Sequence, residues 1–451
     1  MDYPSRMACL SVSRILPLAA AAALVLSLAG CGEAPPPPPP DPGKLAVRDW
    51  PLPGLPGSAQ PDLALTRDGR IVMTWLDTRP GRRPALQFAP WLPETGWERT
   101  RTVAVGNALF VNWADTPHIA ATEDNALWAH WLQKSADAPY AYDVMLARSM
   151  DGGASWGVPV RAHDDATTTE HGFVSFWPMG EGRLGVAWLD GRNTVQAEDG
   201  THADDETAAD DHAGHHGGRG MMTLRAAVFD RNLRASDAAE VDGSVCDCCQ
   251  TDVASVAGAS GPGALLVYRD RTQDEIRDIH AVRFDGERWS APVRVHADDW
   301  MMPACPVNGP AVAALGEDAV VAWYTATSAG GADGMPRVRL ARSADGGRSF
   351  AAPVEIDSGE AVQGRVAVAL DARQAWVLWM REEGGAQSLW LARYRPDLSA
   401  QIERIKLADV RGIGRGTGFP RLLLRGDTAY VVWTDVAGGV PQLAGRVVEG
   451  G

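Results

Sequence analysis

Three cysteines lie close enough together in the sequence to act as one chemical group. Cys246, Cys248 and Cys249 fall within GSVCDCCQTDVA, residues 243–254, and Cys305 follows in MMPACPVNGP. Such thiols can form disulfide bonds, bind a soft metal ion such as Cu or Zn, or stay free and redox-active. The adjacent pair Cys248–Cys249 makes two unstrained disulfides difficult, so the metal interpretation stays open beside the disulfide one.

Histidines add further candidate metal ligands. His118 in ADTPH and His171 in TTEHG are candidates to share a metal with the cysteines, since imidazole and thiolate occur together in Cu and Zn sites. An acidic insertion at residues 197–220 is either a solvated loop or a weak metal-collecting loop. Its four histidines are His202, His212, His215 and His216.

Loops rich in arginine and carboxylates are candidate ligand sites. The densest, YRDRTQDEIRD, is either an ion-pair network that braces a loop or an arginine set that binds a carboxylate beside an acid/base group. The ligand-binding candidates are Asp77, Arg79, Asp190, Arg192, Arg269, Asp278 and Asn308. The catalytic candidates are Arg271, Asp274, Glu275, Arg277 and Tyr268, with Tyr268 beside Glu275 as the nucleophile of a glycosidase.

A sequence repeat must position these residues. Seven short apolar segments carry an aromatic residue at spacings of 54 to 57 residues, apart from one interval of 80 that contains the insertion. The aromatics are Trp75, Trp131, Trp188, Tyr268, Trp323, Trp379 and Trp433. Each repeat holds four short strands, which is typical of a propeller blade. We therefore predict an all-β propeller over residues 44–451, with seven blades (six as the alternative), in which a strand within 44–52 completes the last blade.

The propeller geometry predicts where the cysteines meet. Loops that enter the inner strand of each blade share one rim of the channel. Cys246, Cys248 and Cys249 precede the inner strand of the fourth repeat, and Cys305 precedes that of the fifth. We therefore expect the four thiols to converge at the mouth of the channel.

Two turn segments resemble the Asp-box, S-x-D-x-G-x-x-[WF]. Their motif residues are Ser149, Asp151, Gly153 and Trp156, and Ser343, Asp345, Gly347 and Phe350. On these motifs the chain resembles the sialidase-like, BNR/Asp-box propeller superfamily. The resemblance implies that each box is a structural turn whose aspartate accepts backbone N–H bonds and whose aromatic residue packs between blades. It also implies an exo-sialidase-type glycoside hydrolase as one activity.

The sequence departs from those sialidases in two respects. It has no F-R-I-P segment, and it has seven repeats where six are usual. We therefore expect a binding protein that holds a ligand or metal at a rim rich in Cys, His and Arg. Sialidase-like hydrolysis is the alternative, and a protein-interaction scaffold is the third hypothesis.

The N-terminal sequence is typical of an exported lipoprotein. Arg6 and Arg14 precede an apolar run, which predicts a signal peptide over residues 1–30. The residues LAGC that end at Cys31 resemble a bacterial lipobox, and this resemblance implies lipidation of Cys31. Residues 31–43 form a linker whose six prolines favour polyproline II. We expect a lipid-anchored protein of the bacterial cell envelope, at the outer membrane on its periplasmic or surface face.

The charge of the chain restricts its partners. The formal net charge is -15 at pH 7, which argues against nucleic acid as a partner. The expected partners are the membrane, through the N-terminal lipid, and a glycan, small-molecule or protein ligand. A monomer is expected.

Overall fold

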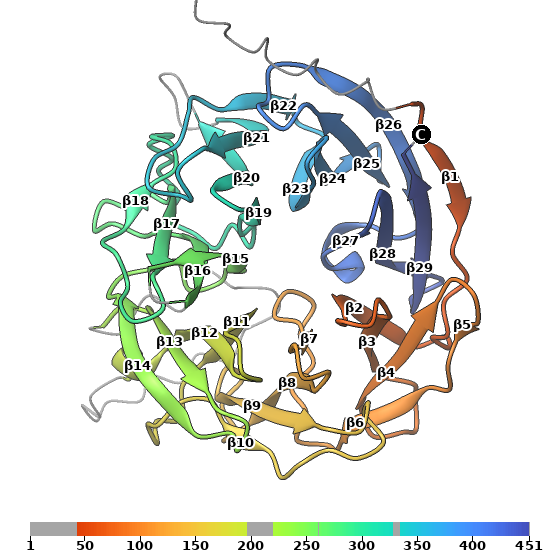
Figure 1. Cartoon of the computed structure of the whole chain (residues 1–451), viewed down its shortest axis with the longest axis vertical. Coiled ribbons are helices and arrows are strands. Elements are labelled where there is room, and N and C mark those ends of the chain that lie inside the picture. Colours follow the sequence, from red (N-terminus) through yellow and green to blue (C-terminus); the bar gives the residue numbers. More distant parts are fainter. Residues whose placement is uncertain (1–42, 196–219, 260, 328–333, 451) are drawn as a thin grey trace, which may run out of the picture. The chain divides into compact units, whose positions relative to one another are not determined.

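Seven antiparallel sheets follow one another around a central axis in the computed structural model (Figure 1). The structure describes residues 43–195, 220–259, 261–327 and 334–450. Each sheet is one blade of a β-propeller, with its first strand innermost (Figure 1). The prediction of seven blades is confirmed, and the six-bladed alternative is wrong.

The first three blades contain the strands before the cysteine segment. In blade one both β5 and β6 pair with β4. The strands are β2 (Ser58–Leu65), β3 (Ile71–Asp77), β4 (Ala85–Leu92), β5 (Gly96–Trp97) and β6 (Arg101–Val105) in blade one; β7 (Ile119–Ala121), β8 (Leu127–Lys134), β9 (Tyr142–Ser149) and β10 (Val160–Arg161) in blade two; and β11 (His171–Pro178), β12 (Leu184–Asp190), β13 (Thr223–Phe229) and β14 (Ala235–Asp242) in blade three.

The remaining blades complete the ring. They consist of β15 (Asp252–Gly258), β16 (Gly261–Arg269), β17 (Ile279–Phe284) and β18 (Val293–Arg294) in blade four; β19 (Ala311–Leu315), β20 (Asp318–Thr327), β21 (Met335–Ser343) and β22 (Val354–Ser358) in blade five; β23 (Val362–Leu370), β24 (Ala375–Glu383), β25 (Ala386–Tyr394) and β26 (Gln401–Val410) in blade six; and β27 (Arg421–Arg425), β28 (Thr428–Ala437), β29 (Val440–Glu449) and β1 (Ala46–Asp49) in blade seven. The only helices among the described residues are two 3-10 turns, η1 (Arg192–Thr194) and η2 (Gly414–Thr417).

The second strand of each blade carries the repeated aromatic residue. In β3 every residue of IVMTWLD is buried, and the same holds for LGVAWLD in β12. Both faces of such a strand are covered by neighbouring blades, so the apolar residues run continuously and do not alternate. The outer strand β14, ASDAAEVD, is mostly exposed and correspondingly polar.

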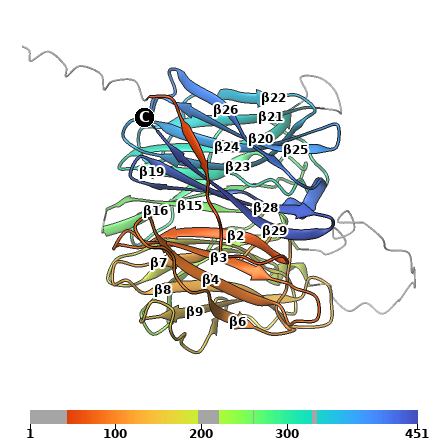
Figure 2. The same cartoon turned by 90° about the vertical axis from the view of Figure 1, so that its right-hand side faces the viewer.

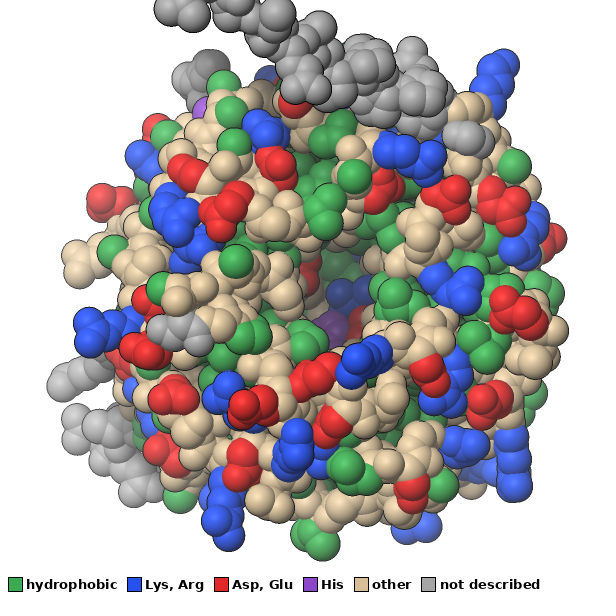
Figure 3. Space-filling model, viewed as in Figure 1, with side chains coloured by type: hydrophobic (Ala, Val, Ile, Leu, Met, Phe, Trp, Pro, Cys, Tyr) green, Lys and Arg blue, Asp and Glu red, His purple; other side chains and the backbone are tan. Residues whose placement is uncertain are grey.

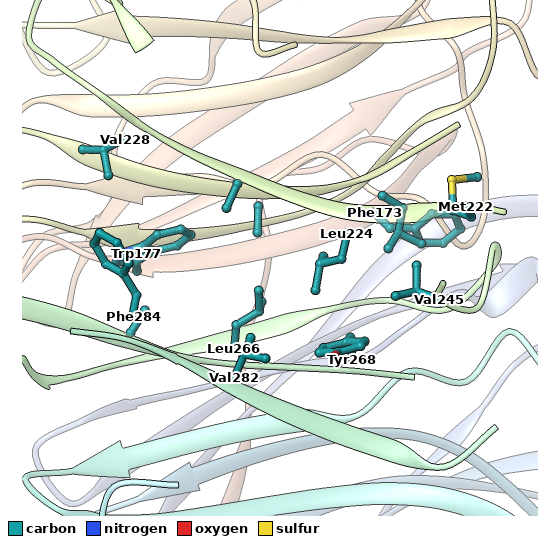
Figure 4. Close-up of a cluster of buried hydrophobic side chains, with 14 of the residues drawn as sticks. Phe173, Trp177, Met222, Leu224, Val228, Val245, Leu266, Tyr268, Val282 and Phe284 are labelled. Carbon is teal, nitrogen blue, oxygen red and sulfur yellow. The ribbon is translucent and has the colours of Figure 1, made fainter. Parts of the chain in front are cut away.

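Large side chains fill the space between the blades. The cluster between blades three and four contains Phe173, Trp177 and Leu224 from one side and Leu266 and Phe284 from the other (Figure 4). Trp177 and Phe284 meet edge to face at 6.4 Å, an arrangement that aromatic rings prefer. This packing fixes the position of each blade relative to the next.

The first and last strands of the propeller, β1 and β29, meet in blade seven. Strand β1 pairs antiparallel with β29, in the register Ala46↔Glu449 to Asp49↔Arg446. Figure 1 shows the two strands side by side, and Figure 2 shows the N-terminal strand in red from the side. Arg446 Nη1 lies 2.7 Å from Asp49 Oδ1 across this pair. The predicted N-terminal strand therefore completes the last blade and covers the edge that β29 would otherwise expose.

The two Asp-box-like segments form tight turns between the third and fourth strands of blades two and five. In the first, the backbone N–H of Gly153 donates to Ser149 Oγ at 2.8 Å and that of Ser155 donates to Asp151 Oδ1 at 2.9 Å. Gly153 has φ +82°, and a Cβ there would come within 2.0 Å of the Phe88 ring in blade one. Glycine is thus required both by the backbone and by the neighbouring blade.

The described residues contain no helix with the length and hydrophobicity needed to cross a bilayer. The predicted signal peptide and residues 31–42 of the linker, Cys31 among them, lie outside the described residues.

Candidate functional site

The cysteine segment connects the outer strand of blade three to the inner strand of blade four. The N–H of Val245 donates to Met222 O, and that of Cys246 donates to Arg269 O, both at 3.0 Å. Cys305 lies in the loop between β18 and β19, which enters the inner strand of blade five. Backbone pairing to blades three and four thus fixes one cysteine loop, and the second loop comes from the next blade.

The four sulfur atoms form one cluster. Cys246 Sγ lies 3.3 Å from Cys249 Sγ and 3.8 Å from Cys248 Sγ. The ligand atoms of Asp247, Cys248 and Cys305 also lie within 4.8 Å of one another. Cys246 and Cys249 are buried, while Cys248 and Cys305 are half-buried.

The four cysteines of the described residues are free thiols. The two S–S separations above exceed the roughly 2.05 Å of a disulfide bond. The disulfide pairing that the sequence left open is therefore not formed in this structure. The metal and free-thiol interpretations remain.

Buried arginines face the sulfur atoms. Arg277 Nη1 donates to Cys246 Sγ at 3.1 Å, and the Arg277 side chain is fully buried. Burial raises the pKa of the Cys246 thiol to about 11. Burial alone would also raise the pKa of Cys249, but hydrogen bonds with Cys246 and Cys248 and the charge of Arg269 hold it well below its ordinary value. Ionisation is therefore easier at Cys249 than at Cys246.

An ion-pair network braces the cysteine loop. Glu275 accepts from Arg271 Nη2 at 2.7 Å and from Arg277 Nη2 at 2.8 Å. Asp247 lies 3.6 Å from Arg277 and 3.7 Å from Arg271. Of the two interpretations offered for this loop, the contacts match the bracing network.

Tyr268 contacts another carboxylate than Glu275, the residue considered as its partner in a nucleophile pair. The Tyr268 hydroxyl donates to Asp242 Oδ2 at 2.5 Å and not to Glu275, and its side chain is buried. Asp274 is exposed. Tyr268 and Glu275 therefore do not make a nucleophile pair here.

A pocket of about 50 Å³ opens beside the thiols. It is lined by Asn112, Trp113, Ala114, Tyr140, Glu170, Phe173, Asp247, Cys248, Cys305 and Val307. Cys248 and Cys305 are thus the thiols that face this pocket. The ring as a whole is hollowed at its centre, and Figure 3 shows charged and histidine side chains inside that hollow.

The half-buried carboxyl group of Glu170, which lines the pocket, meets a tyrosine and a carboxyl group that are buried behind it. The Tyr142 hydroxyl lies 2.5 Å from Glu170 Oε1 and 3.3 Å from Asp115 Oδ2. Burial raises the pKa of Glu170 to about 8 and that of Asp115 to about 7. At neutral pH the Glu170 carboxyl is therefore mainly protonated and can donate a hydrogen bond to a ligand.

The two histidines considered as cysteine partners have other neighbours. His118 Nδ1 lies 3.2 Å from Asp62 Oδ2, and Arg421 approaches the same ring at 3.4 Å. The His171 ring stacks on His163 at 3.7 Å, and both rings contact Asp165. Neither histidine is within the groups of ligand atoms that contain the cysteines.

The remaining ligand-binding candidates are engaged within the protein. Asp77 pairs with Arg79 at 2.5 Å, and Asp190 pairs with Arg192 at 2.8 Å. Three more hold backbone groups in place. Arg269 donates to the carbonyls of Asn308, Arg277 and Tyr324. Asp278 accepts from the N–H groups of Asp299 and Trp300, and Asn308 Oδ1 accepts from the N–H of Arg365. His202, His212, His215 and His216 lie outside the described residues.

Sequence reasoning missed several residues of the site. Asp247 stands inside the quoted cysteine motif, so its position was a usable signal. Glu170 and Tyr142 gave none, because they come from the start of blade three and from β9 of blade two and meet only across the blade junction. His163 likewise becomes a neighbour of His171 only in three dimensions.

Comparisons with known proteins add little beyond the fold. No family model and no curated protein matches the chain. Among solved structures, a protein of unknown function from Dyadobacter fermentans DSM 18053 is 14% identical, covers 91% of this chain and 100% of its own, and has a TM-score of 0.47. A GH93 α-L-arabinofuranosidase of Fusarium graminearum, solved with arabinobiose, is 13% identical. The match covers 87% of this chain and 93% of the arabinofuranosidase chain, with a TM-score of 0.45.

A third similar structure is a sialidase. The Hadza microbial sialidase Hz136 is 15% identical, covers 72% of this chain and 63% of its own, and has a TM-score of 0.41. Scores at this level carry no argument about activity. The propeller fold rests on the sheet topology itself.

Proposed function

We propose that this propeller is a metal-binding protein that holds a Cu(I) ion through the thiolates of Cys246, Cys248 and Cys249. One observation carries the proposal: the three sulfur atoms lie within 4.8 Å of one another in a buried loop. Thiolates are the ligands that select soft ions such as Cu(I). The neighbouring Arg277 and Arg269 offset the negative charge that thiolates bring into the interior.

The number of sulfur atoms favours Cu(I) over Zn(II). Structural zinc sites are almost always four-coordinate, with all four ligands from the protein. The buried group contains three cysteines and no histidine. A three-thiolate set suits an ion that accepts a lower coordination number, and a bound ion would protect the thiols from oxidation outside the cytoplasm.

Titration of the reduced full-length chain with Cu(I) under anaerobic conditions, in competition with a chromophoric chelator, tests this function. We expect tight binding that Cys249→Ser weakens by at least about 100-fold, because one of three ligands is lost. A Cys9→Ser/Cys31→Ser variant keeps all four clustered thiols and should bind like the wild type. Equal affinity of the wild type and Cys249→Ser would exclude the site, and a preference for Zn(II) would exclude the choice of metal.

A second candidate function, hydrolysis of a glycoside, is favoured by the Tyr142–Glu170 pair. Its oxygen atoms lie 2.5 Å apart, and Glu170 lines the pocket. Tyr142 is fully buried behind that wall, however, which leaves metal binding as the better supported function. Turnover of a fluorogenic sialoside and other glycosides by the wild type, and its loss in Glu170→Gln, would support hydrolysis; no turnover with any of them would exclude it.

We further propose that the protein is a lipid-anchored member of the Asp-box propellers and acts in the cell envelope. The support is the lipobox-like sequence at Cys31, the proline-rich linker and the two box-like turns. Metabolic labelling with a fatty-acid analogue should mark the wild type and leave Cys31→Ser unlabelled. Labelling of both proteins would place the lipid elsewhere.

A further inference from the structure

We propose that the thiol cluster holds a second metal ion, bound by Asp247, Cys248 and Cys305, with the Cys248 sulfur bridging the two ions. This inference rests on the proposed function, because it takes the first ion at Cys246, Cys248 and Cys249 as given. The second position offers two thiolates, which suit a soft ion, and one carboxylate, and it is open to a further ligand.

The spacing of the donors divides them into two sets. Cys246, Cys248 and Cys249 form one mutually close group, and Asp247, Cys248 and Cys305 form another. Cys305 is not part of the first group, so the four sulfur atoms do not surround one common point as a single four-thiolate site requires. Cys248 belongs to both groups, and a thiolate sulfur has enough lone pairs to bind two ions.

The distances show the same central place for Cys248. Its sulfur lies 3.8 Å from Cys246 Sγ, within 4.8 Å of Cys249 Sγ in the first group, and within 4.8 Å of Cys305 Sγ in the second. Cys305 Sγ also lies 3.8 Å from Asp247 Oδ1, so the outer donors are close to one another as well. The outer set therefore exists as a group before any ion binds.

The two positions differ in their access to solvent. Asp247, Cys248 and Cys305 all line the 50 Å³ pocket, whereas Cys246 and Cys249 do not. Cys246 and Cys249 are 1% and 2% exposed. The inner position is thus closed by protein, and the outer one has room for a ligand from solvent, which is the difference between structural and reactive metal sites.

The surrounding charges can accommodate a second cation. Four thiolates with Asp247 and Glu275 carry six negative charges, against the three positive charges of Arg269, Arg271 and Arg277. Two Cu(I) ions offset two more, so the loaded cluster keeps a net charge of about -1.

Counting the bound ions tests the inference. Anaerobic Cu(I) titration of the reduced full-length Cys9→Ser/Cys31→Ser chain should reach about two ions per chain. In that background Asp247→Asn and Cys305→Ser should each reach about one, because the inner thiolates remain. X-ray absorption of the fully loaded protein should show copper–copper scattering, which should disappear in Cys305→Ser.

The outcomes separate this inference from the function on which it rests. One ion in the wild type, with one ion retained in Cys305→Ser, overturns the second position and leaves the inner site standing. If the chain with the intact cluster binds one ion and Cys305→Ser binds none, the ion occupies a single four-thiolate site, and the second position is again overturned. No bound Cu(I) at all overturns both proposals. The circular dichroism spectrum of each variant should match the wild type, and Asp247→Asn, which preserves side-chain size, serves as the second variant if Cys305→Ser is unstable.

Discussion

At the scale of single residues, the site is defined by how its ionisable groups are buried. Cys249 favours the thiolate, while Cys246 keeps its proton beside it. Glu170 and Asp115 stay protonated to unusually high pH because they are buried around the Tyr142 hydroxyl. These groups make the stability of the protein depend on pH.

The first prediction concerns Glu170→Gln. The folded-state pKa of Glu170 is raised from 4.5 to about 8, so the folded protein holds a proton that the unfolded chain releases between these values. The free energy of unfolding should therefore fall as pH rises through this window. Asp115, whose pKa is raised to about 7, should lower it in the same direction as pH rises to about 7. Glutamine has no proton to lose, so its variant should not show this fall. From pH 5 to pH 8 the free energy of unfolding of Glu170→Gln should therefore rise relative to that of the wild type by on the order of 2–4 kcal/mol. Urea unfolding at the two pH values measures this, and a constant difference would contradict it.

At the scale of elements, the turns between third and fourth strands hold neighbouring blades together. The Gly153 turn packs on Phe88 of the preceding blade, and Gly347 packs in the same way on Leu265. Adjacent glycines of the same turn provide a comparison, because Gly152 also has positive φ but has no neighbouring atom within 4 Å of the position of a Cβ.

The second prediction is that Gly153→Ala destabilises the protein by about 2–4 kcal/mol, through a clash with the Phe88 ring added to the strain of positive φ. Gly152→Ala, with the strain alone, should cost about 1 kcal/mol. Thermal unfolding followed by circular dichroism compares the two variants. Equal losses would mean that the contact between blades contributes nothing.

A third prediction concerns the strand that closes the ring. Deletion of residues 44–49 removes β1 and exposes the edge of β29, so the thermal midpoint should fall by several degrees and self-association should appear. Arg48→Ala removes only an exposed ion pair with Glu449 and should change stability by less than about 0.5 kcal/mol. Light scattering and thermal unfolding distinguish the two, and an unchanged midpoint in the deletion would show that β1 is dispensable.

At the scale of the whole molecule, the propeller brings distant residues into one site. Residues 246–249 and Cys305 are one repeat apart in sequence and meet because neighbouring blades present equivalent loops on one rim. The three thiols of the proposed Cu(I) site meet Arg277 only in the folded ring, so an ion bound there favours the folded state and should stabilise it.

The fourth prediction follows from this linkage. A Cu(I) concentration about 100 times the dissociation constant should stabilise the wild type by about 2.7 kcal/mol. The thermal midpoint of the reduced protein should rise accordingly, while that of Cys249→Ser should stay near its metal-free value. A rise of the same size in both would place the bound copper outside the cluster.

The sequence was sufficient to predict the architecture because each blade repeats its own signal. The seven aromatics, from Trp75 to Trp433, each fall in the second strand of a blade. The site was predicted less completely. Cys305 could be placed beside Cys248 from the repeat alone, but the partners of His118 and His171 could not, since Asp62 and His163 reach them through side-chain packing across blades.

The pairing of β1 with β29 has a practical consequence. Because the propeller begins and ends side by side in blade seven, a short peptide could join these two points, and the chain could be reopened at another hairpin, such as the β25–β26 turn, to give a circular permutant. Such a chain would attach its tether to a different blade while leaving the thiol loops of blades four and five intact.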